Sequence, residues 1–352
     1  MEKELSILIV DDSRVFRSIL ERLLVKIEGV RIAGSVWSGE KALEFLQDHT
    51  VDLVTLDVEM PGLDGLETLL RIGKMPEKRR PGVLMVSSLT RSGADTTVRA
   101  LEQGAFDFVA KPGPEMQGGA ESLERMLAMK IKGWRSRCFH QAPAADMPVI
   151  QKATSIKLAP MSGKLEVVLI GVSTGGPKAL TEMLPLLSER VSCPVLIVQH
   201  MPPEFTKSLA QTLDKKCAYT IVEAAEGMQP RPKHMYIAPG GMHMVVRRGR
   251  QGIELGLNQQ EPENGCRPSV DVLFRSAADV YEGSSMVAVV LTGMGCDGTA
   301  GARQLKRKGA YCIAQDEESS VVWGMPGALV EAGLADEQAP LLQIPASIAK
   351  RA

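Results

Sequence analysis

Residues 167–177 of this 352-residue chain read Val-Val-Leu-Ile-Gly-Val-Ser-Thr-Gly-Gly-Pro. The apolar run is rich in β-branched residues, which is typical of a strand buried on both faces of a parallel sheet. The glycines, followed by Pro177 where a helix would begin, predict a tight strand-to-helix turn. Such a turn would hold Ser173 at the carboxyl edge of the sheet, where the N–H groups of the next helix can stabilise an oxyanion. We therefore interpret Ser173 as a candidate nucleophile.

The same stretch has a competing interpretation. Gly-rich turns between a strand and a helix more often cradle a phosphate or a dinucleotide than carry a nucleophile. The G-x-G-x-x-G and G-x-x-x-x-G-K-[ST] patterns are both missing, and no acidic residue follows the second strand as a dinucleotide site would require. The nucleotide interpretations are weakened, but catalysis needs support from other parts of the chain.

The composition is that of an ordinary globular protein, with 44% hydrophobic and 24% charged residues, and the length favours two domains. A formal net charge of -1 gives no electrostatic case for a nucleic-acid or anionic-membrane partner. The six cysteines form no C-x-x-C pair, which argues against a zinc ribbon or disulfide scaffold. Without a signal peptide or a membrane-spanning run, we expect a cytoplasmic protein that does not insert into membranes.

The first 112 residues alternate strand-like runs with helical patterns. The strand-like runs cover residues 5–10, 30–34, 51–56, 82–86 and 106–109. Ser13 is placed to cap the first helix. Five successive βα units predict a doubly wound, five-stranded parallel sheet.

Polar residues follow the carboxyl ends of these strands. Doubly wound sheets place their functional residues at these ends. The polar residues are Asp11, Asp12, Asp57, Ser87 and Lys111. Three carboxylates and a lysine at one sheet edge suit one Mg²⁺ ion and a phosphoryl group. An Asp-rich loop that merely caps helices would explain Asp12, but it leaves Asp57 and Lys111 unaccounted for.

This segment resembles a response-regulator receiver domain. The motifs that carry the resemblance are Asp11-Asp12, the stretch Thr55 to Gly65 and Lys111-Pro112. The resemblance implies that Asp57 is the phosphoacceptor and that Ser87 and Lys111 contact the phosphoryl oxygens. It implies a Mg²⁺ site formed by Asp12, Asp57 and the backbone carbonyl of Glu59, with Asp11 nearby. It also implies a cis peptide between Lys111 and Pro112.

Residues 121–134 continue as a helical pattern that becomes basic. The basic residues indicate a solvated helix face, and the alternative, a partner-binding patch, has no supporting motif. The polar, Pro-containing stretch that follows predicts a linker. We therefore expect a receiver domain at residues 1–120, a helical extension and linker at 121–164, and a second domain at 165–352.

The second domain again alternates strands and helices. Strand-forming runs cover residues 166–171, 194–199, 219–222, 285–291 and 310–314, and helical patterns cover 177–188 and 268–281. The exception is Met235 to Leu257, where apolar runs surround Pro239-Gly240-Gly241 and suggest an antiparallel hairpin at a sheet edge. The predicted fold class is α/β, with two doubly wound domains, the second a mostly parallel Rossmann-like sheet.

Three strands of this domain end at chemically capable residues. Ser173 follows the first strand, His200 follows the second, and Asp297 lies in the Gly-rich loop after residues 285–291. On one sheet edge they could form a relay in which the imidazole takes the serine proton and the carboxylate fixes its tautomer. The backbone amides of Thr174 and Met294 are candidates for an oxyanion hole.

Each of these residues also has an ordinary interpretation. His200 alone would more often be a hydrogen-bonded strand-end histidine, and Asp297 alone could cap the following helix. A zinc site formed by His200, His234 and His243 is an alternative interpretation, but no metal-binding spacing supports it. Cys296 could be a rival nucleophile, although a buried spectator thiol is the more common case.

The second domain resembles the chemotaxis protein-glutamate methylesterase family. The motifs include residues 171–176, 199–201, 236–240, 267–274, 291–298 and 314–326. The resemblance places Ser173, His200 and Asp297 on the family's triad. It implies hydrolysis of glutamate γ-methyl esters, and possible glutamine deamidation, on chemoreceptor cytoplasmic helices without a cofactor. It also implies a chemotaxis histidine kinase as phosphodonor and an unphosphorylated receiver that occludes the active site.

Two other output functions are alternatives to the esterase. A DNA-binding output would need a basic helix-turn-helix after the linker, and the sequence has none. A catalytically silent docking domain would have no reason to activate Ser173.

Overall fold

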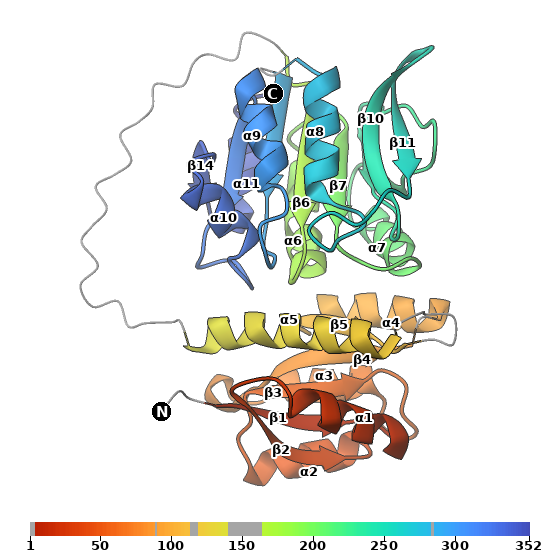
Figure 1. Ribbon diagram of the computed structural model, residues 1–352, viewed down its shortest axis with the longest axis vertical. Coiled ribbons are helices and arrows are strands. Elements are labelled where there is room, and N and C mark those ends of the chain that lie inside the picture. The colour runs from red at the N-terminus through yellow and green to blue at the C-terminus, as the bar shows by residue number, and fades with distance from the viewer. Residues whose placement is uncertain (1–3, 89, 113–118, 140–163, 283–284) are drawn as a thin grey trace, which may run out of the picture.

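The computed structural model describes residues 4–88, 90–112, 119–139, 164–282 and 285–352, and Figure 1 shows their arrangement. Two α/β halves lie one above the other, residues 4–139 (the first half) and residues 164–352 (the second half). The linker predicted at residues 140–163 lies outside the described residues. Among those described, no helix is long and apolar enough to cross a bilayer.

The first half contains a five-stranded parallel sheet in the order β2-β1-β3-β4-β5. Its strands are β1 (Leu5–Val10), β2 (Val30–Val36), β3 (Leu53–Asp57), β4 (Gly82–Ser87) and β5 (Asp107–Ala110). Its helices are α1 (Arg14–Leu24), α2 (Gly39–Asp48), α3 (Gly65–Gly73), α4 (Arg91–Glu102) and α5 (Gly119–Phe139). Helix α1 begins as predicted, because the Ser13 hydroxyl accepts a hydrogen bond from the Phe16 N–H.

The second half contains a seven-stranded sheet in the order β14-β13-β12-β6-β7-β9-β8, and all its neighbouring strands are parallel. Its strands are β6 (Val167–Val172), β7 (Val195–Gln199), β8 (Thr220–Glu223), β9 (His234–Ile237), β12 (Met286–Val290), β13 (Tyr311–Gln315) and β14 (Glu337–Ala339). Its helices are α6 (Gly176–Ser188), α7 (Phe205–Asp214), α8 (Val270–Val280), α9 (Thr299–Lys308), α10 (Met325–Glu331) and α11 (Ile344–Ala349). The predicted fold class is confirmed.

The antiparallel hairpin lies further along the chain than the sequence suggested. It pairs β10 (His243–Gly249) with β11 (Gly252–Asn258) as a separate two-stranded sheet. The apolar run before Pro239 is instead the parallel strand β9, which pairs with β7 and β8. Apolar periodicity alone could not decide between these pairings, because the partner strands are distant in sequence.

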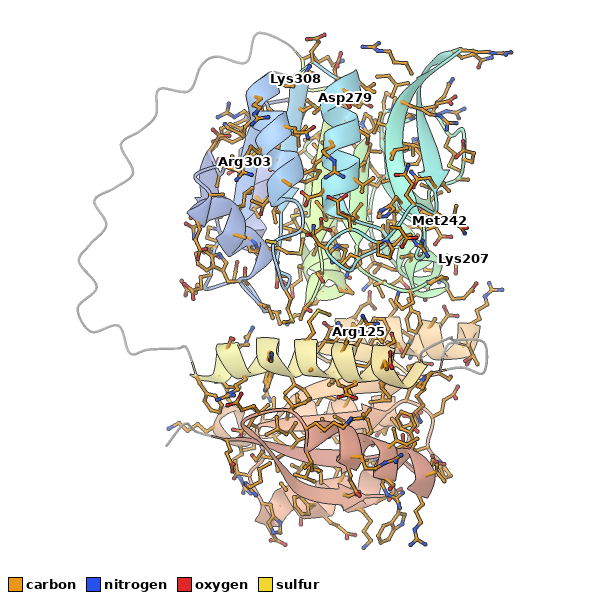
Figure 2. All side chains as sticks on the ribbon, in the orientation of Figure 1. Arg125, Lys207, Met242, Asp279, Arg303 and Lys308 are labelled. Atoms are coloured by element: carbon orange, nitrogen blue, oxygen red, sulfur yellow. The ribbon has the colours of Figure 1, made fainter. Side chains whose placement is uncertain are left out.

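The β6 strand lies at the centre of the second half, and all of its residues are buried. The carboxyl ends of β6, β7 and β12 point toward α4 and α5 of the first half (Figure 1). Side chains from both halves fill the space between them (Figure 2). The rim of the sheet that carries the predicted nucleophile therefore lies at the junction of the two halves.

Candidate active site

Ser173 occupies the first position after β6, as the sequence predicted. Its N–H donates to the Thr292 carbonyl at 3.0 Å, and its carbonyl accepts from the Gln199 side-chain amide at 3.0 Å. Gly175 then takes a left-handed conformation with a φ of 79° as the N-cap of α6, which few residues other than glycine adopt without strain. The turn thus fixes the Ser173 backbone between the strand ends of β7 and β12.

His200 and Asp297 meet although they are far apart in sequence. His200 follows β7, and its Nε2 lies 2.8 Å from Oδ2 of Asp297, which comes from the loop after β12. An ionised carboxylate can only accept, so Nε2 carries the proton of this bond. The structure therefore brings together two of the three predicted triad residues.

Asp297 is held in place by a network of donors. Its Oδ1 accepts hydrogen bonds from the Ser269 hydroxyl, the Asn264 amide and the backbone N–H groups of Asp271 and Gly298. Its Oδ2 accepts from the Val270 N–H at 2.8 Å in addition to His200. The side chain is 2% exposed. This carboxylate is therefore rigid, and it does more than cap a helix.

The titration of the pair follows from this environment. Burial alone would lower the pKa of His200, but hydrogen bonds and charge interactions with Asp297 and Cys266 outweigh it and raise the pKa to about 10. Burial would raise the pKa of Asp297, but the hydrogen bond and charge of His200 and the donated backbone N–H groups hold that pKa well below its usual range. The imidazolium form is favoured in this resting geometry.

The second ring nitrogen of His200 contacts a residue that sequence reasoning missed. Nδ1 lies 3.4 Å from Sγ of Cys266, and within the described residues no hydrogen bond joins either ring nitrogen to the Ser173 hydroxyl. Cys266 directly precedes the Arg267-Pro268-Ser269 motif. Its position next to that motif was the one sequence feature that could have identified it as a site residue. Cys296, the thiol considered from sequence, is exposed, and no contact with His200 is recorded for it.

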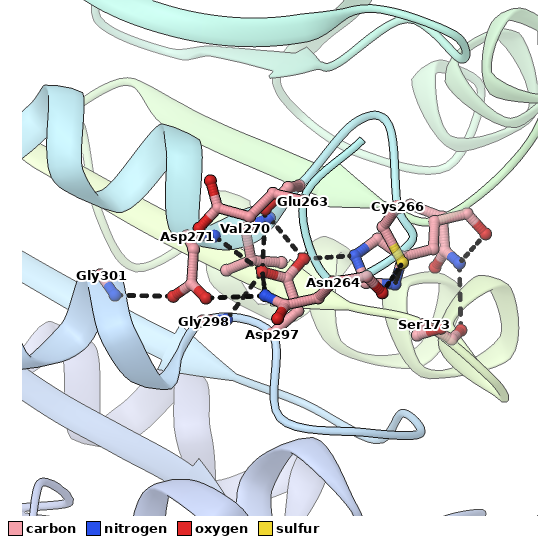
Figure 3. A network of polar contacts seen from close by, with 12 residues as sticks. Ser173, Glu263, Asn264, Cys266, Val270, Asp271, Asp297, Gly298 and Gly301 are labelled. Carbon is pink, nitrogen blue, oxygen red and sulfur yellow. Dashed lines mark hydrogen bonds and ion pairs between the residues drawn. The ribbon is translucent and has the colours of Figure 1, made fainter. Parts of the chain in front are cut away.

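A tight turn carries Cys266 to the histidine. Glu263 and Cys266 exchange two backbone hydrogen bonds, at 3.1 and 2.8 Å. Asn264 and Gly265, the two residues between them, have φ values of 53° and 74°. The Asn264 side chain donates to both Asp297 and Asp271 (Figure 3). One turn thus supplies contacts to both members of the His200–Asp297 pair.

The loop after β12 lies directly against the predicted nucleophile. A side chain added at Gly293 would meet Cβ of Ser173 at 2.7 Å, so only glycine permits this approach. Across the described part of the chain, no hydrogen bond is recorded from the N–H of Thr174 or of Met294. Both N–H groups are therefore able to donate a hydrogen bond close to Ser173, which is compatible with their predicted oxyanion role.

The alternative zinc site of three histidines is not formed. His243 is fully buried, where its Nδ1 accepts from the Ser269 N–H and its Nε2 lies 3.1 Å from the Glu261 carbonyl. His234 lies at the start of β9, with Nδ1 2.9 Å from the Pro232 carbonyl. Among the described residues, neither histidine belongs to a metal-compatible cluster with His200.

The acidic residues predicted in the first half converge at the edge of its sheet. Ligand atoms of Asp11, Asp12 and Asp57 all lie within 4.8 Å of one another. Lys111 forms ion pairs with Asp57 at 2.7 Å and with Asp11 at 2.8 Å. A set of carboxylate oxygens matches the preference of Mg²⁺ for hard donors. The residues therefore fit the ion that the receiver resemblance implies.

Asp57 and Ser87 of this pocket are both buried. Burial, reinforced by Asp11 and opposed by the Lys111 hydrogen bond, raises the pKa of Asp57 to about 6. Ser87 is fully buried and donates to the Gly93 carbonyl at 3.2 Å, so in this structure it is engaged with α4. The expected cis peptide at Lys111–Pro112 is absent, since the cis bond among the described residues joins Arg267 to Pro268.

Known proteins resemble the chain along nearly its whole length. The family model described as CheB methylesterase matches residues 168–348, and the response regulator receiver domain model matches residues 7–118. A protein-glutamate methylesterase/protein-glutamine glutaminase of Desulfotalea psychrophila is 43% identical, with 97% of each chain covered. A second protein of this name from Caulobacter vibrioides is 44% identical, with 98% of each chain covered.

A solved structure gives the same assignment for the second half. The CheB methylesterase catalytic domain of Thermotoga maritima is 40% identical, with a TM-score of 0.52. The match covers 54% of this chain and all of that domain. With matches to both family models and to relatives along nearly its whole length, the chain belongs to the protein-glutamate methylesterase family that carries an N-terminal response-regulator receiver domain.

Proposed function

We propose that this protein is a phosphorylation-activated serine hydrolase that demethylates glutamate γ-methyl esters on the cytoplasmic helices of chemoreceptors. The observation that carries the proposal is the contact of His200 with the buried Asp297 at the carboxyl edge of the sheet, beside the Ser173 turn. Relatives named protein-glutamate methylesterase/protein-glutamine glutaminase support the substrate class and a second activity on glutamine. We expect the protein to act in the cytoplasm.

The chemistry follows from the orientation of the imidazole. Because Asp297 accepts from Nε2, Nδ1 is the nitrogen left to take a proton, and Ser173 would deliver its hydroxyl proton there. The Ser173 oxygen attacks the ester carbonyl, and the amides of Thr174 and Met294 stabilise the oxyanion. The imidazolium then protonates the departing methanol, and water hydrolyses the acyl-serine by the reverse sequence of proton transfers. A glutamine substrate would release ammonia in place of methanol.

The thiol of Cys266 must yield its position for this reaction to proceed. In the resting geometry Cys266 faces Nδ1, and Ser173 does not. Rotation of the Cys266 side chain would free Nδ1 without disturbing the Asp297 network, because the thiol contributes nothing to that network. Substrate binding next to Ser173 would favour this exchange. The imidazole would then lose an interaction that raises its pKa, so a larger fraction of it would be unprotonated and able to accept the Ser173 proton.

Contacts between the halves support occlusion of the site in the unphosphorylated protein. Gly133 of α5 packs against the side chains of Met294 and Val322. Arg137 of α5 donates to the Ser320 carbonyl at 3.3 Å. These partners belong to loops that adjoin the Ser173 turn: Val322 exchanges hydrogen bonds with Thr292, whose hydroxyl also donates to Thr174. Helix α5 therefore covers the oxyanion side of the site.

A second group of contacts joins α4 and β5 to helices of the second half. The ring of Phe108, in β5, stacks on Phe205 at the start of α7 with centroids 4.5 Å apart. Glu102, at the end of α4, forms an ion pair with Lys216 at 2.8 Å and accepts from the Thr181 hydroxyl. If the closed form suppresses activity a hundredfold, it must be favoured by about 2.7 kcal/mol. A modest interface of this kind can supply that free energy.

Phosphorylation of Asp57 would weaken this interface. The phosphoryl group adds roughly two negative charges and three acceptor oxygens beside Lys111 and Ser87. Attraction of Ser87 toward them would break its hydrogen bond to Gly93, at the start of α4, and so displace the helix that contacts the second half. Asp11, Asp12 and Asp57, with the Glu59 carbonyl, would hold Mg²⁺, which offsets the charge of the phosphoryl group. A chemotaxis histidine kinase is the expected phosphodonor.

The proposal is tested by measuring methanol release from a methylated chemoreceptor fragment, with and without acetyl phosphate and Mg²⁺. We expect activity from the wild type, stimulation by acetyl phosphate, and loss of that stimulation in Asp57→Asn. Ser173→Ala should keep phosphorylation at Asp57 but release no methanol. Retained hydrolysis in Ser173→Ala would refute the nucleophile assignment, and labelling of wild-type Ser173 by an organophosphonate would separate the esterase from a silent docking domain.

A further inference from the structure

Nδ1 of His200 and Sγ of Cys266 form a pair of potential metal ligands that ester hydrolysis does not require. They lie 3.4 Å apart, and Cys266 is only half-buried, so the pair can be reached from solvent. Asp297 accepts from Nε2, and the neutral imidazole therefore holds its lone pair on Nδ1, facing the sulfur. Thiolate sulfur and imidazole nitrogen are the donors that Zn²⁺ and similar ions select.

The separation of the two atoms matches a shared ion. In a tetrahedral site the Zn–S distance is about 2.3 Å and the Zn–N distance about 2.0 Å, which places sulfur and nitrogen about 3.5 Å apart. The observed 3.4 Å differs little from this value. An ion could therefore bind to both atoms without movement of the backbone.

The surroundings also provide the outer shell of a metal site. Metal-binding histidines usually donate their other ring N–H to a carboxylate, which orients the ring and makes it more basic. Asp297 has this relation to His200, and its own position is fixed by the network described above. The turn at residues 263–266, closed by two backbone hydrogen bonds, holds Cys266 on the other side of the ring. Both ligands are thus preorganised.

We propose that His200 and Cys266 form a two-residue binding site for a thiophilic divalent ion, with Zn²⁺ the best match, and that the bound ion inhibits the esterase. The Cys266 thiol and the Nδ1–H of the protonated imidazole each release a proton to solvent, after which the sulfur forms the metal–sulfur bond and the freed Nδ1 lone pair forms the metal–nitrogen bond. Water completes the coordination, because both oxygens of Asp297 are already engaged. No electron is transferred. The inhibition rests on the proposed function, since a coordinated Nδ1 cannot accept the Ser173 proton, whereas the binding does not.

Binding is tested directly with Co²⁺ as a spectroscopic substitute for Zn²⁺. The reduced full-length wild type should show a thiolate-to-Co²⁺ charge-transfer band that Zn²⁺ abolishes. Ser173→Ala and Cys296→Ala should keep the band, the latter as a control for an exposed thiol, and Cys266→Ala should lose it. Cys266→Ser, which preserves the size of the side chain, serves if the alanine variant does not fold. A missing band in the wild type, or an unchanged band in the Cys266 variants, would overturn the site.

Inhibition is tested by the methanol assay at increasing Zn²⁺. Each variant is compared with its own activity without Zn²⁺. We expect the half-inhibiting concentration to rise at least about tenfold in Cys266→Ala relative to the wild type and Cys296→Ala. Equal sensitivity of the three proteins would overturn the inhibitory role. If Ser173→Ala kept both the Co²⁺ band and full hydrolysis, the nucleophile assignment would fail while the metal site stood.

Discussion

The sharpest test of the site is Asp297→Asn, an isosteric change whose cost can be worked out atom by atom. The four donors to Oδ1 require an acceptor at that position, so the new amide nitrogen must replace Oδ2. There it faces His200 Nε2 and the Val270 N–H, each 2.8 Å from Oδ2. The amide would donate to Nε2 and force the imidazole proton onto Nδ1. The base would then hold a proton where it needs a lone pair.

Both activity and stability should fall. The same tautomer error in a serine protease triad lowers kcat about 10⁴-fold, and we expect a comparable loss here. The buried Val270 N–H would lose its acceptor, which costs about 1–3 kcal/mol. The four bonds to Oδ1 would become bonds to a neutral amide and weaken, while relief of the buried charge would offset part of this loss. A net loss of about 2 kcal/mol would lower the Tm of the second half by about 4–8 °C.

Asp271→Asn is the matched control, because it removes the neighbouring carboxylate without touching His200. Burial, opposed by the Gly301 N–H and reinforced by Asp297, raises the pKa of Asp271 to about 6. Neutralising it should therefore cost little near neutral pH. Methanol release and thermal unfolding would be measured for both variants. Hydrolysis by Asp297→Asn within tenfold of the wild type would refute the assignment of the carboxylate.

Three further changes test other parts of the structure. Glu102→Ala removes an ion pair across the interface worth about 0.5–1 kcal/mol, so the activity without phosphorylation should rise about two- to fivefold; unchanged basal hydrolysis would argue against occlusion through α4. Because the raised pKa keeps His200 protonated at neutral pH, kcat/KM should increase as the pH rises, and Cys266→Ala should shift this increase to lower pH; a pH profile unmoved by the substitution would contradict the role given to the thiol. Gly293→Ala would push a methyl group against Ser173 and should lower kcat about a hundredfold, while the free energy of unfolding should fall by less than the activation free energy rises. Wild-type turnover in this variant would show that the close approach of residue 293 to Ser173 is unimportant.

Features set by local interactions could be predicted from the sequence. The strands of the first half and the cap at Ser13 depend on neighbouring residues, and the structure reproduces them. The short polar strand β14 (Glu337–Ala339) has no apolar pattern and was not predicted. The parallel pairing of β9 was also missed, because it depends on a strand distant in the chain.

The candidate site also has features that could be predicted from local sequence and features that could not. That Ser173, His200 and Asp297 follow strand ends could be read from residue type and position, since parallel strands place their carboxyl ends on one edge. Residue type and position could not predict which side of the imidazole each partner would occupy. The contact of Cys266 with Nδ1 arises because a turn distant from β7 folds back over the histidine. Only coordinates could show that Asp297 takes Nε2 and leaves Nδ1 to the thiol.

The distribution of contacts suggests how regulation and chemistry divide within the site. Among the residues that the structure describes, the hydrogen-bond partners of the His200–Asp297 pair all come from the second half, so separating the halves would break none of these bonds. The contacts of α5 fall instead on Met294 and Val322, beside the nucleophile turn. Separation of the halves would therefore uncover the oxyanion side while the base and its carboxylate stay as they are. Under the proposed function, the receiver would control access to Ser173, whereas the thiol of Cys266 would leave Nδ1 only when substrate binds.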